Sequence, residues 1–127
     1  MAVLLITHDL GVVAHGVDDV VVMYAGKVAE YSKVTDLFGK PMHPYTQGLL
    51  ASLPHFGARH SSDGKGRQRL KGIQGMVPDL RDLPTGCHFH DRCPWVQPLC
   101  KEQVPPLEEK AAQHWVSCFE VGKESGL

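Results

Sequence analysis

The feature that most constrains this sequence is a set of four cysteines in its last third, in the pattern C-x5-C-x6-C-x17-C. They are Cys87, Cys93, Cys100 and Cys118. The same stretch contains four prolines, which limit helices and strands: Pro94, Pro98, Pro105 and Pro106. A segment of this kind has few ways to bury an apolar core. We therefore expect a cross-link or a bound metal to hold it together.

Three explanations of the cysteines remain open from their spacing. Two disulfides would suit a secreted protein, but the N-terminus lacks the basic segment of a secretion signal. A structural zinc site usually includes a closer C-x2-4-C pair, although His88, His90 or His114 could replace one cysteine. An iron–sulfur cluster tolerates longer spacings because it is larger than a single ion. The spacing favours the cluster over zinc, and zinc over disulfides or free thiols.

Size and charge narrow the class of protein. The chain has 127 residues, which is room for one ordinary domain or two very small units. Thirteen Lys and Arg against 14 Asp and Glu give a net charge of -1, which argues against a nucleic-acid-binding domain. No apolar run approaches the roughly 18 residues of a membrane span. We expect a soluble, cytoplasmic protein with no nucleic-acid partner.

The N-terminal segment reads as part of a larger sheet. Residues 2–8 form an almost continuous apolar run, which is typical of a strand buried on both faces of a parallel sheet. Such a strand needs neighbours, so we expect the beginning of its sheet to be missing from this chain or supplied by another. A buried edge strand or a short core helix in a small α+β domain is the alternative.

Shorter elements follow this segment. The pattern predicts a helix over 10–16 with Asp9 as its N-cap, a hairpin of strands 17–24 and 27–31 around Ala25-Gly26, and short helices over 33–39 and 44–53. Residues 55–69 are polar and rich in Gly and Ser, which predicts a flexible linker; its basic residues could touch phosphate or a membrane surface. Residues 70–78 read as a strand and turn that open a second unit.

Several of these segments resemble one protein family. Residues 4–13, with Thr7-His8-Asp9, resemble the last core strand and switch-histidine loop of an ABC-transporter ATPase, and residues 22–30 resemble the hairpin that follows it. His43-Pro44-Tyr45-Thr46 is narrower and resembles the oligopeptide/dipeptide importer branch. The cysteine segment from Gly86 to Cys118 resembles the C-terminal extension of that branch.

The resemblance implies an α+β fold. It would be the tail end of a P-loop ABC ATPase core (last core strand, β-hairpin and short helices), followed by a small cysteine-tied C-terminal unit. Residues 1–54 would be the remnant of the ATPase domain, 55–69 the linker, and 70–127 the oligopeptide/dipeptide transporter C-terminal domain.

The implied function is that of a C-terminal fragment of the ATP-binding, energy-coupling subunit of a peptide importer. The chain has no P-loop pattern, no strand ending in Asp-Glu and no ABC signature, so we expect it not to hydrolyse ATP alone. Permease subunits in the membrane, a second ATPase subunit and, indirectly, a peptide-binding protein would be its partners. It would lie on the inner face of the cell membrane. The alternative is a stand-alone iron–sulfur or zinc-stabilised regulatory or interaction module.

The resemblance also implies roles for particular residues. His8 would be the switch histidine that reaches the γ-phosphate and the attacking water, but only in the intact parent protein with ATP and Mg. Taken alone, it would be an ordinary loop histidine. The four cysteines would hold a [4Fe–4S] cluster, with zinc as the alternative. Phe89, Arg92 and Pro94 would pack around them, and His43 with Tyr45 would either face the membrane subunit or cap a helix.

Overall fold

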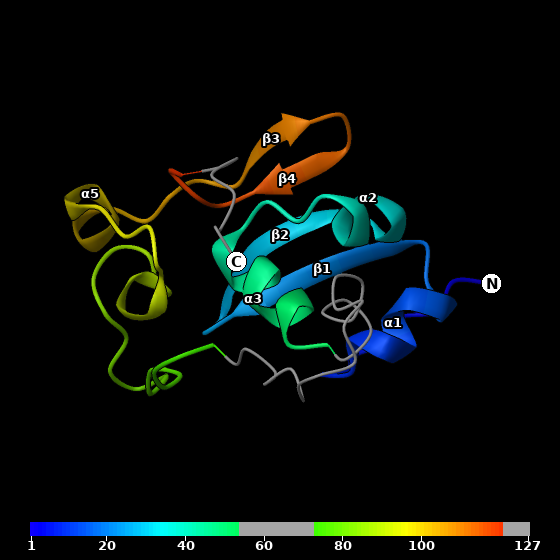
Figure 1. The fold of residues 1–127 in the computed structure, drawn as a ribbon, viewed down its shortest axis with the longest axis horizontal. Helices are drawn as coiled ribbons and strands as arrows, with labels where there is room; N and C mark the ends of the chain where they lie inside the picture. The colour runs from blue at the N-terminus through cyan, green and yellow to red at the C-terminus, as the bar shows by residue number, and fades with distance from the viewer. Residues whose placement is uncertain (54–72, 121–127) are drawn as a thin grey trace, which may run out of the picture.

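The computed structural model describes residues 1–53 and 73–120 of the chain (Figure 1). Its helices are α1 (Leu10–Gly16), α2 (Val34–Gly39), α3 (Pro44–Ala51), the 3-10 turn η2 (His90–Arg92) and α5 (Pro98–Glu102). Its strands are β1 (Asp19–Tyr24), β2 (Lys27–Lys33), β3 (Glu108–Ala111) and β4 (His114–Val116). The whole predicted linker 55–69 and residues 70–72 of the predicted strand and turn lie within 54–72, outside the described residues.

The β1–β2 hairpin forms where the sequence predicts it. Ala25 and Gly26 both have positive φ angles, 46° and 80°, as the two central residues of a tight type I′ turn require. Along β1 the buried residues alternate with exposed ones, so that Val20, Val22 and Tyr24 face the core. This alternation is the period of two expected for a strand with one solvated face.

A bulge interrupts the regular pairing of this hairpin. Val22 pairs with Glu30 while the next residue, Met23, pairs with Val28, so Ala29 is an extra residue on β2. Ala29 and Glu30 are consequently both buried, although they are neighbours in sequence. The bulge thus brings a carboxylate into the interior.

The second edge of β2 carries strands that the sequence pattern did not predict. Within the described part of the chain, β1, β2, β4 and β3 form one antiparallel sheet in that order. β4 pairs with β2 through Glu30 opposite Val116 and Tyr31 opposite Trp115. The sheet therefore joins residues from the predicted 1–54 and 70–127 units, while the boundary between those units stays a prediction.

The apolar core lies between β1–β2 and the short helices on one face of these strands (Figure 1). Its fully or nearly buried members are Val20, Val22, Ala29 and Leu37. Half-buried side chains from α1, α2 and α3, and from Val17 just after α1, pack against this core. They are Val13, Val17, Val34, Phe38, Tyr45 and Leu49. The helices predicted at 10–16, 33–39 and 44–53 agree with α1, α2 and α3 to within two residues.

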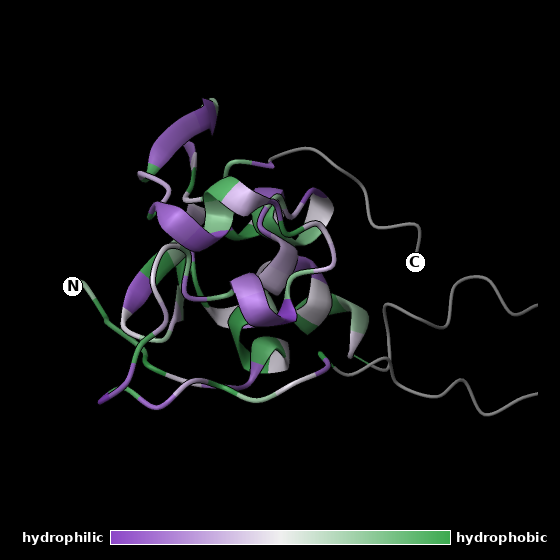
Figure 2. Cartoon of the chain, turned by 90° about the vertical axis from the view of Figure 1, so that its left-hand side faces the viewer, coloured by the Kyte–Doolittle hydropathy of each residue, from purple (hydrophilic) through white to green (hydrophobic). Residues whose placement is uncertain are grey.

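The prediction of a buried strand over residues 2–8 is wrong for this structure. These residues, which the structure describes, form neither strand nor helix, and Leu4 and Ile6 are 87% and 88% exposed. Figure 2 shows this segment as a hydrophobic stretch that leads away from the packed elements. A strand exists only through hydrogen bonds to neighbouring strands, and no described strand pairs with this one. The last core strand of the expected ATPase fold is therefore not formed here.

The strand predicted at the start of the second unit is also not observed. Residues 73–78, the described part of the predicted 70–78 segment, contain no strand. They are instead fastened by Arg92, whose guanidinium donates to the carbonyl oxygens of Ile73 (3.2 Å) and Gln74 (2.9 Å). None of the helices in residues 1–53 and 73–120 is both long and apolar enough to cross a membrane.

Candidate functional site

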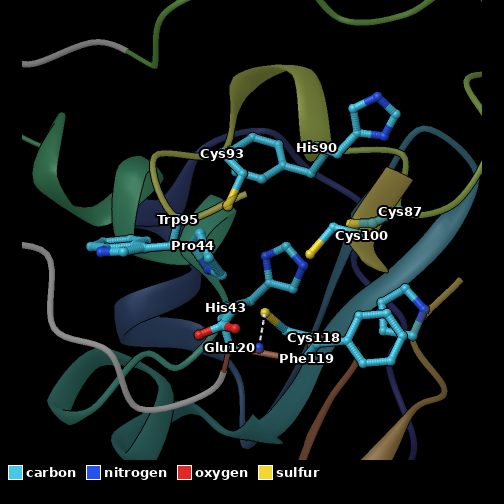
Figure 3. A pocket seen from close by; sticks show the side chains of 12 residues that line it. His43, Pro44, Cys87, His90, Cys93, Trp95, Cys100, Cys118, Phe119 and Glu120 are labelled. Atoms are coloured by element: carbon cyan, nitrogen blue, oxygen red, sulfur yellow. Dashed lines mark hydrogen bonds between the residues drawn. The ribbon is translucent and has the colours of Figure 1, made fainter. Parts of the chain in front are cut away.

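The four cysteines come from four different places in the fold and line one pocket (Figure 3). Cys87 precedes η2, Cys93 caps its C-terminal end, Cys100 lies in α5, and Cys118 follows β4. The remaining lining is largely apolar and aromatic: Pro44, Phe89, Trp95, Pro105 and Phe119, together with His43, His90 and Glu120. The space between these side chains is small, about 10 Å³. The sequence therefore identified a set of residues that the fold does gather.

Local backbone hydrogen bonds hold three of the cysteines together. The amide of Cys87 donates to the carbonyl oxygen of Cys100 at 2.8 Å, which ties the loop before η2 to helix α5. The amide of Cys93 donates to His90, and the amide of His90 donates to Cys87. These three cysteines thus belong to one locally folded unit.

Cys118 reaches the pocket through the sheet. β4 pairs with β2, and just beyond it the amide of Ser117 donates to the carbonyl oxygen of Ala29 at 2.9 Å. The hydroxyl of Ser117 donates to the carbonyl oxygen of Pro105 at 2.6 Å. The sulfur of Cys118 accepts a hydrogen bond from the amide of Glu120 at 3.3 Å, drawn as a dashed line in Figure 3.

All four cysteines are free thiols in this structure, so neither of the two disulfides left open by the sequence is formed. Burial raises the pKa of the Cys87 and Cys93 thiols and raises that of Cys118 to about 12, and the neighbouring cysteines add to each effect. Without a cation these thiols therefore stay protonated at neutral pH. A bound cation would stabilise the thiolates and release protons on binding.

The pocket does not have the geometry of a single-ion site. Among the described residues, no group of three or more His, Cys, Asp or Glu side chains is arranged to hold one metal ion. A tetrahedral zinc site needs every sulfur about 2.3 Å from the ion, so its ligands must be nearly in contact with one another. The four cysteines line the same pocket, but among the described residues no three of them form such a group.

The histidines proposed as replacement zinc ligands mostly have other partners. His114 is buried and its Nε2 donates to the carboxylate of Glu30 at 2.5 Å. His88 is hydrogen-bonded through Nδ1 to the carbonyl oxygen of Ala25, at the hairpin turn. His90 does line the pocket and interacts through Nε2 with Asp91 at 2.9 Å.

Glu30 and His114 form a buried unit that sequence patterns did not reveal. The Glu30 carboxylate accepts from the backbone amides of Met42 and His43 as well as from His114. It therefore connects β2, β4 and the residues that begin α3. In a regular strand two neighbouring residues point to opposite faces, so Ala29 and Glu30 would not both be buried. Only a predicted bulge could have indicated that Glu30 is buried here.

His43 caps the N-terminus of α3, which is one of the two roles considered for it. Its Nδ1 accepts from the amide of Tyr45 at 3.0 Å, and Pro44 occupies the first helical position. Tyr45 packs against Tyr24 and Phe89, with ring centroids 4.7 and 5.5 Å away. These aromatic contacts fasten α3 to the cysteine segment.

His8 is not part of this arrangement. It is exposed, precedes α1, and is not among the residues that line the cysteine pocket. Its neighbours form a local helix start, in which Asp9 accepts from the amide of Gly11 at 2.9 Å. The described residues do not test its predicted role as the switch histidine, which stays a prediction.

Residues 29–100 match the family described as Oligopeptide/dipeptide transporter, C-terminal region, which is more than half of the chain. The chain belongs to this family. The matched span runs from the bulge on β2 to Cys100 in α5, so it includes the helix α3 with its cap and three of the four cysteines. Cys118 and His8 lie outside it.

Individual relatives extend the similarity over nearly the whole chain. A probable peptide ABC transporter ATP-binding protein of Sinorhizobium fredii is 46% identical over 119 residues, covering 93% of this chain and 33% of that protein. The dipeptide transport ATP-binding protein DppD of Haemophilus influenzae is 40% identical and covers 99% and 36%. The oligopeptide transport ATP-binding protein AppF of Bacillus subtilis is 45% identical and covers 91% and 34%. This chain spans about a third of the length of these relatives.

The buried cap residue gives this family member a testable pH dependence. Burial lowers the pKa of His43 from 6.5 to about 4, with a hydrogen bond to the backbone of Ser117 acting in the opposite direction. Between these pH values the unfolded chain binds a proton that the folded chain excludes. We therefore expect the free energy of unfolding of the metal-free chain to decrease as pH falls from 6.5 towards 4.

Urea titrations at several pH values in this window would measure the effect. His43→Gln should weaken the pH dependence, whereas the same change at the exposed His15 should not, because His15 does not line the pocket. Equal pH dependence in wild type and His43→Gln would contradict the prediction.

Proposed function

We propose that this chain is the C-terminal part of the ATP-binding subunit of a peptide-importing ABC transporter, and that its four cysteines hold a [4Fe–4S] cluster. The family match and the names of the relatives support the first part. The observation that carries the second part is that three cysteines of one local unit and Cys118, which follows β4, line the same pocket.

The chemistry of the pocket fits an iron–sulfur cluster. Thiolates are the ligands of such clusters, and the pocket offers four of them with a mainly apolar lining. The sequence spacing C-x5-C-x6-C-x17-C, which lacks a close C-x2-4-C pair, favours a cluster over zinc. Cys87, Cys93, Cys100 and Cys118 would be the ligands.

The residues around the cysteines would protect this site. Phe89, Trp95 and Phe119 limit the access of water, and the amide of Glu120 donates to the sulfur of Cys118. Hydrogen bonds to ligand sulfurs and exclusion of solvent are the means by which proteins tune reduction potential. When bound, the cluster would cross-link the cysteine segment and could exchange one electron.

The remaining roles depend on the full-length subunit. There we propose that His8 acts as the switch histidine toward the γ-phosphate of ATP, with Mg and with phosphate-binding residues that this chain does not contain. The partners would be transmembrane permease subunits and a second ATPase subunit, with a peptide-binding protein acting indirectly. The subunit would lie at the inner face of the cell membrane.

Anaerobic reconstitution of the full chain with iron and sulfide tests the cluster. We expect about four iron and four sulfide per chain with visible charge-transfer absorption. Cys118→Ser should lose most of the bound iron, because one thiolate ligand is missing. Ala111→Ser, which adds a hydroxyl at an exposed position of β3, should bind as much iron as wild type.

Metal analysis of the reconstituted protein separates the alternatives. Stoichiometric zinc with no iron, or iron content unaffected by Cys118→Ser, would overturn the cluster proposal. The assignment to the transporter subunit would then still stand on the family match.

A further inference from the structure

Residues 73–75, called the strap below, run from helix α3 to the 3-10 turn η2. The first strap residue packs on α3, because the three heavy atoms nearest to a Cβ atom built at Gly48 all belong to Ile73, the closest at 2.7 Å. The absence of a side chain at Gly48 therefore leaves the space that Ile73 fills. The last strap residue lies against Arg92, since a Cβ atom at Gly75 would come within 3.0 Å of the Arg92 Cγ atom.

The guanidinium of Arg92 holds the strap with all three of its nitrogens in use. Nε donates to the carbonyl oxygen of Gln74 at 2.9 Å, and one terminal nitrogen donates to that of Ile73 at 3.2 Å. The other terminal nitrogen donates to the hydroxyl of Tyr24, at the end of β1, at 3.3 Å. A lysine side chain has one nitrogen and cannot reproduce this fork. Arg92 thus joins the strap to both β1 and η2.

Arg92 is the last residue of η2, and this turn lies between two of the pocket cysteines. The amide of His90, at the start of η2, donates to the carbonyl oxygen of Cys87 at 3.1 Å, and the amide of Cys93 donates to that of His90 at 3.4 Å. Both cysteines line the pocket (Figure 3). The backbone between them is therefore one small turn, and a contact that restrains Arg92 also restrains Cys87 and Cys93.

A second contact attaches the same turn to α3. Phe89, which directly precedes η2, packs on Tyr45 of α3 and on Tyr24 of β1, with ring centroids 5.5 and 5.1 Å apart. Phe89 is buried, whereas Gln74 and Gly75 of the strap are exposed. Local opening costs least where few buried apolar contacts have to break. Of the two attachments, the strap is therefore the one that can open while the rest of the fold stays intact.

We propose that the strap is a conformational latch on the cysteine site. When Arg92 holds it, η2 is braced against α3 and the thiols of Cys87 and Cys93 are shielded. When the strap opens, these two cysteines become accessible while the remaining fold is unchanged. The inference rests on the proposed function only in that access to these thiols would set how readily the cluster is assembled or lost.

Two substitutions release the strap from opposite ends. Arg92→Lys keeps the positive charge but loses the three-nitrogen fork. Gly48→Leu places a helix-favouring side chain in the space of Ile73 and leaves Arg92 unchanged. The matched controls are Arg81→Lys, at a side chain that is 90% exposed, and Gly39→Leu, where a Cβ atom has no neighbour within 4 Å.

Two rates are measured on the folded, metal-free full chain and resolved by mass spectrometry. Thermolysin cleavage before Met76 reports on opening of the strap, and alkylation by iodoacetamide reports on each cysteine. We expect both release variants to be cleaved about tenfold faster, since charge-assisted hydrogen bonds or an apolar contact are lost. Alkylation of Cys87 and Cys93 should become about fivefold faster, while that of Cys118, which follows β4, should change less than about twofold. Both controls should match the wild type.

Three results would overturn the inference. Unchanged cleavage in the release variants would show that these contacts do not hold the strap. Faster cleavage without faster alkylation of Cys87 and Cys93 would show that the strap does not brace η2. A rise of equal size at Cys118 would indicate general loosening. Either release variant decides the question if the other does not fold. Iron content of the wild type, measured separately, tests the cluster, and its absence would leave these rates and their meaning intact.

Discussion

Replacing Glu30 by alanine is expected to lower the free energy of unfolding by about 4 kcal/mol. The buried carboxylate accepts hydrogen bonds from two backbone amides, at Met42 and His43, and from the imidazole of His114. Its removal leaves all three donors buried without their partner, and each unsatisfied group carries a desolvation penalty. It also removes the contact by which β4 and α3 are tied to the same point of β2.

Glutamine at the same position should be less damaging. The amide of Glu30→Gln keeps a carbonyl oxygen for the Met42 and His43 amides, and a neutral His114 can accept from its NH2 group. We therefore expect a loss of about 2 kcal/mol, between alanine and wild type. Urea unfolding followed by circular dichroism measures both variants. Glu102→Ala, at an exposed position, is the control and should change stability by less than about 0.5 kcal/mol.

Glu30 and His114 should also contribute to stability as one unit. In a double-mutant cycle, Glu30→Ala and His114→Ala should be non-additive, because each single change already breaks the same contact. Additive effects, or a Glu30→Ala variant as stable as wild type, would show that the buried carboxylate does not hold the two halves of the sheet together.

Alanine at Gly86 is expected to destabilise the cysteine unit by about 3 kcal/mol. Gly86 has a φ angle of 75°, in the left-handed region that favours glycine. A Cβ atom there would lie 2.3 Å from the carbonyl oxygen of Cys100 and 2.9 Å from that of Lys101. The backbone at Gly86 would have to move away from the backbone at Cys100 and Lys101. This movement would break the hydrogen bond from the Cys87 amide to the carbonyl oxygen of Cys100.

The same substitution should also reduce iron binding at the proposed site. Gly86→Ala should move Cys87 away from Cys100 and reduce iron bound after reconstitution several-fold. Gly39→Ala is the control, because a Cβ atom at Gly39 has open space around it and the φ angle there is not in the left-handed region. Wild-type stability and wild-type iron content in Gly86→Ala would contradict this account of the loop.

Local sequence signals were sufficient for the N-terminal elements. The Ala25-Gly26 turn between runs of Val and Tyr predicted the hairpin, and Pro44 marked the first turn of α3. These signals work because turn geometry and helix starts depend on a few adjacent residues. The helix cap at His43 was one of two roles considered for it, and the structure identified the capping bond.

Signals that depend on partners were less successful. The apolar run at 2–8 predicted a strand, but a strand is defined by its neighbours and none pairs with it in the described structure. Conversely, β3 and β4 escaped prediction because Glu108–Ala111 is polar and short. They form strands because β2 offers an open edge to β4, and β4 in turn pairs with β3.

The four cysteines illustrate both sides of this division. Their number, their spacing and the lack of an apolar core around them led to the prediction of one shared site. The fold places all four at one pocket, while the group bound there stays a prediction. Which side chains would complete the pocket was decided only by the fold. The bulge at Ala29 turns Glu30 inward, and the pairing of β2 with β4 brings Cys118 to His43, 75 positions away in the sequence. Contacts over such separations depend on the register between strands, which the residues of any one segment do not specify.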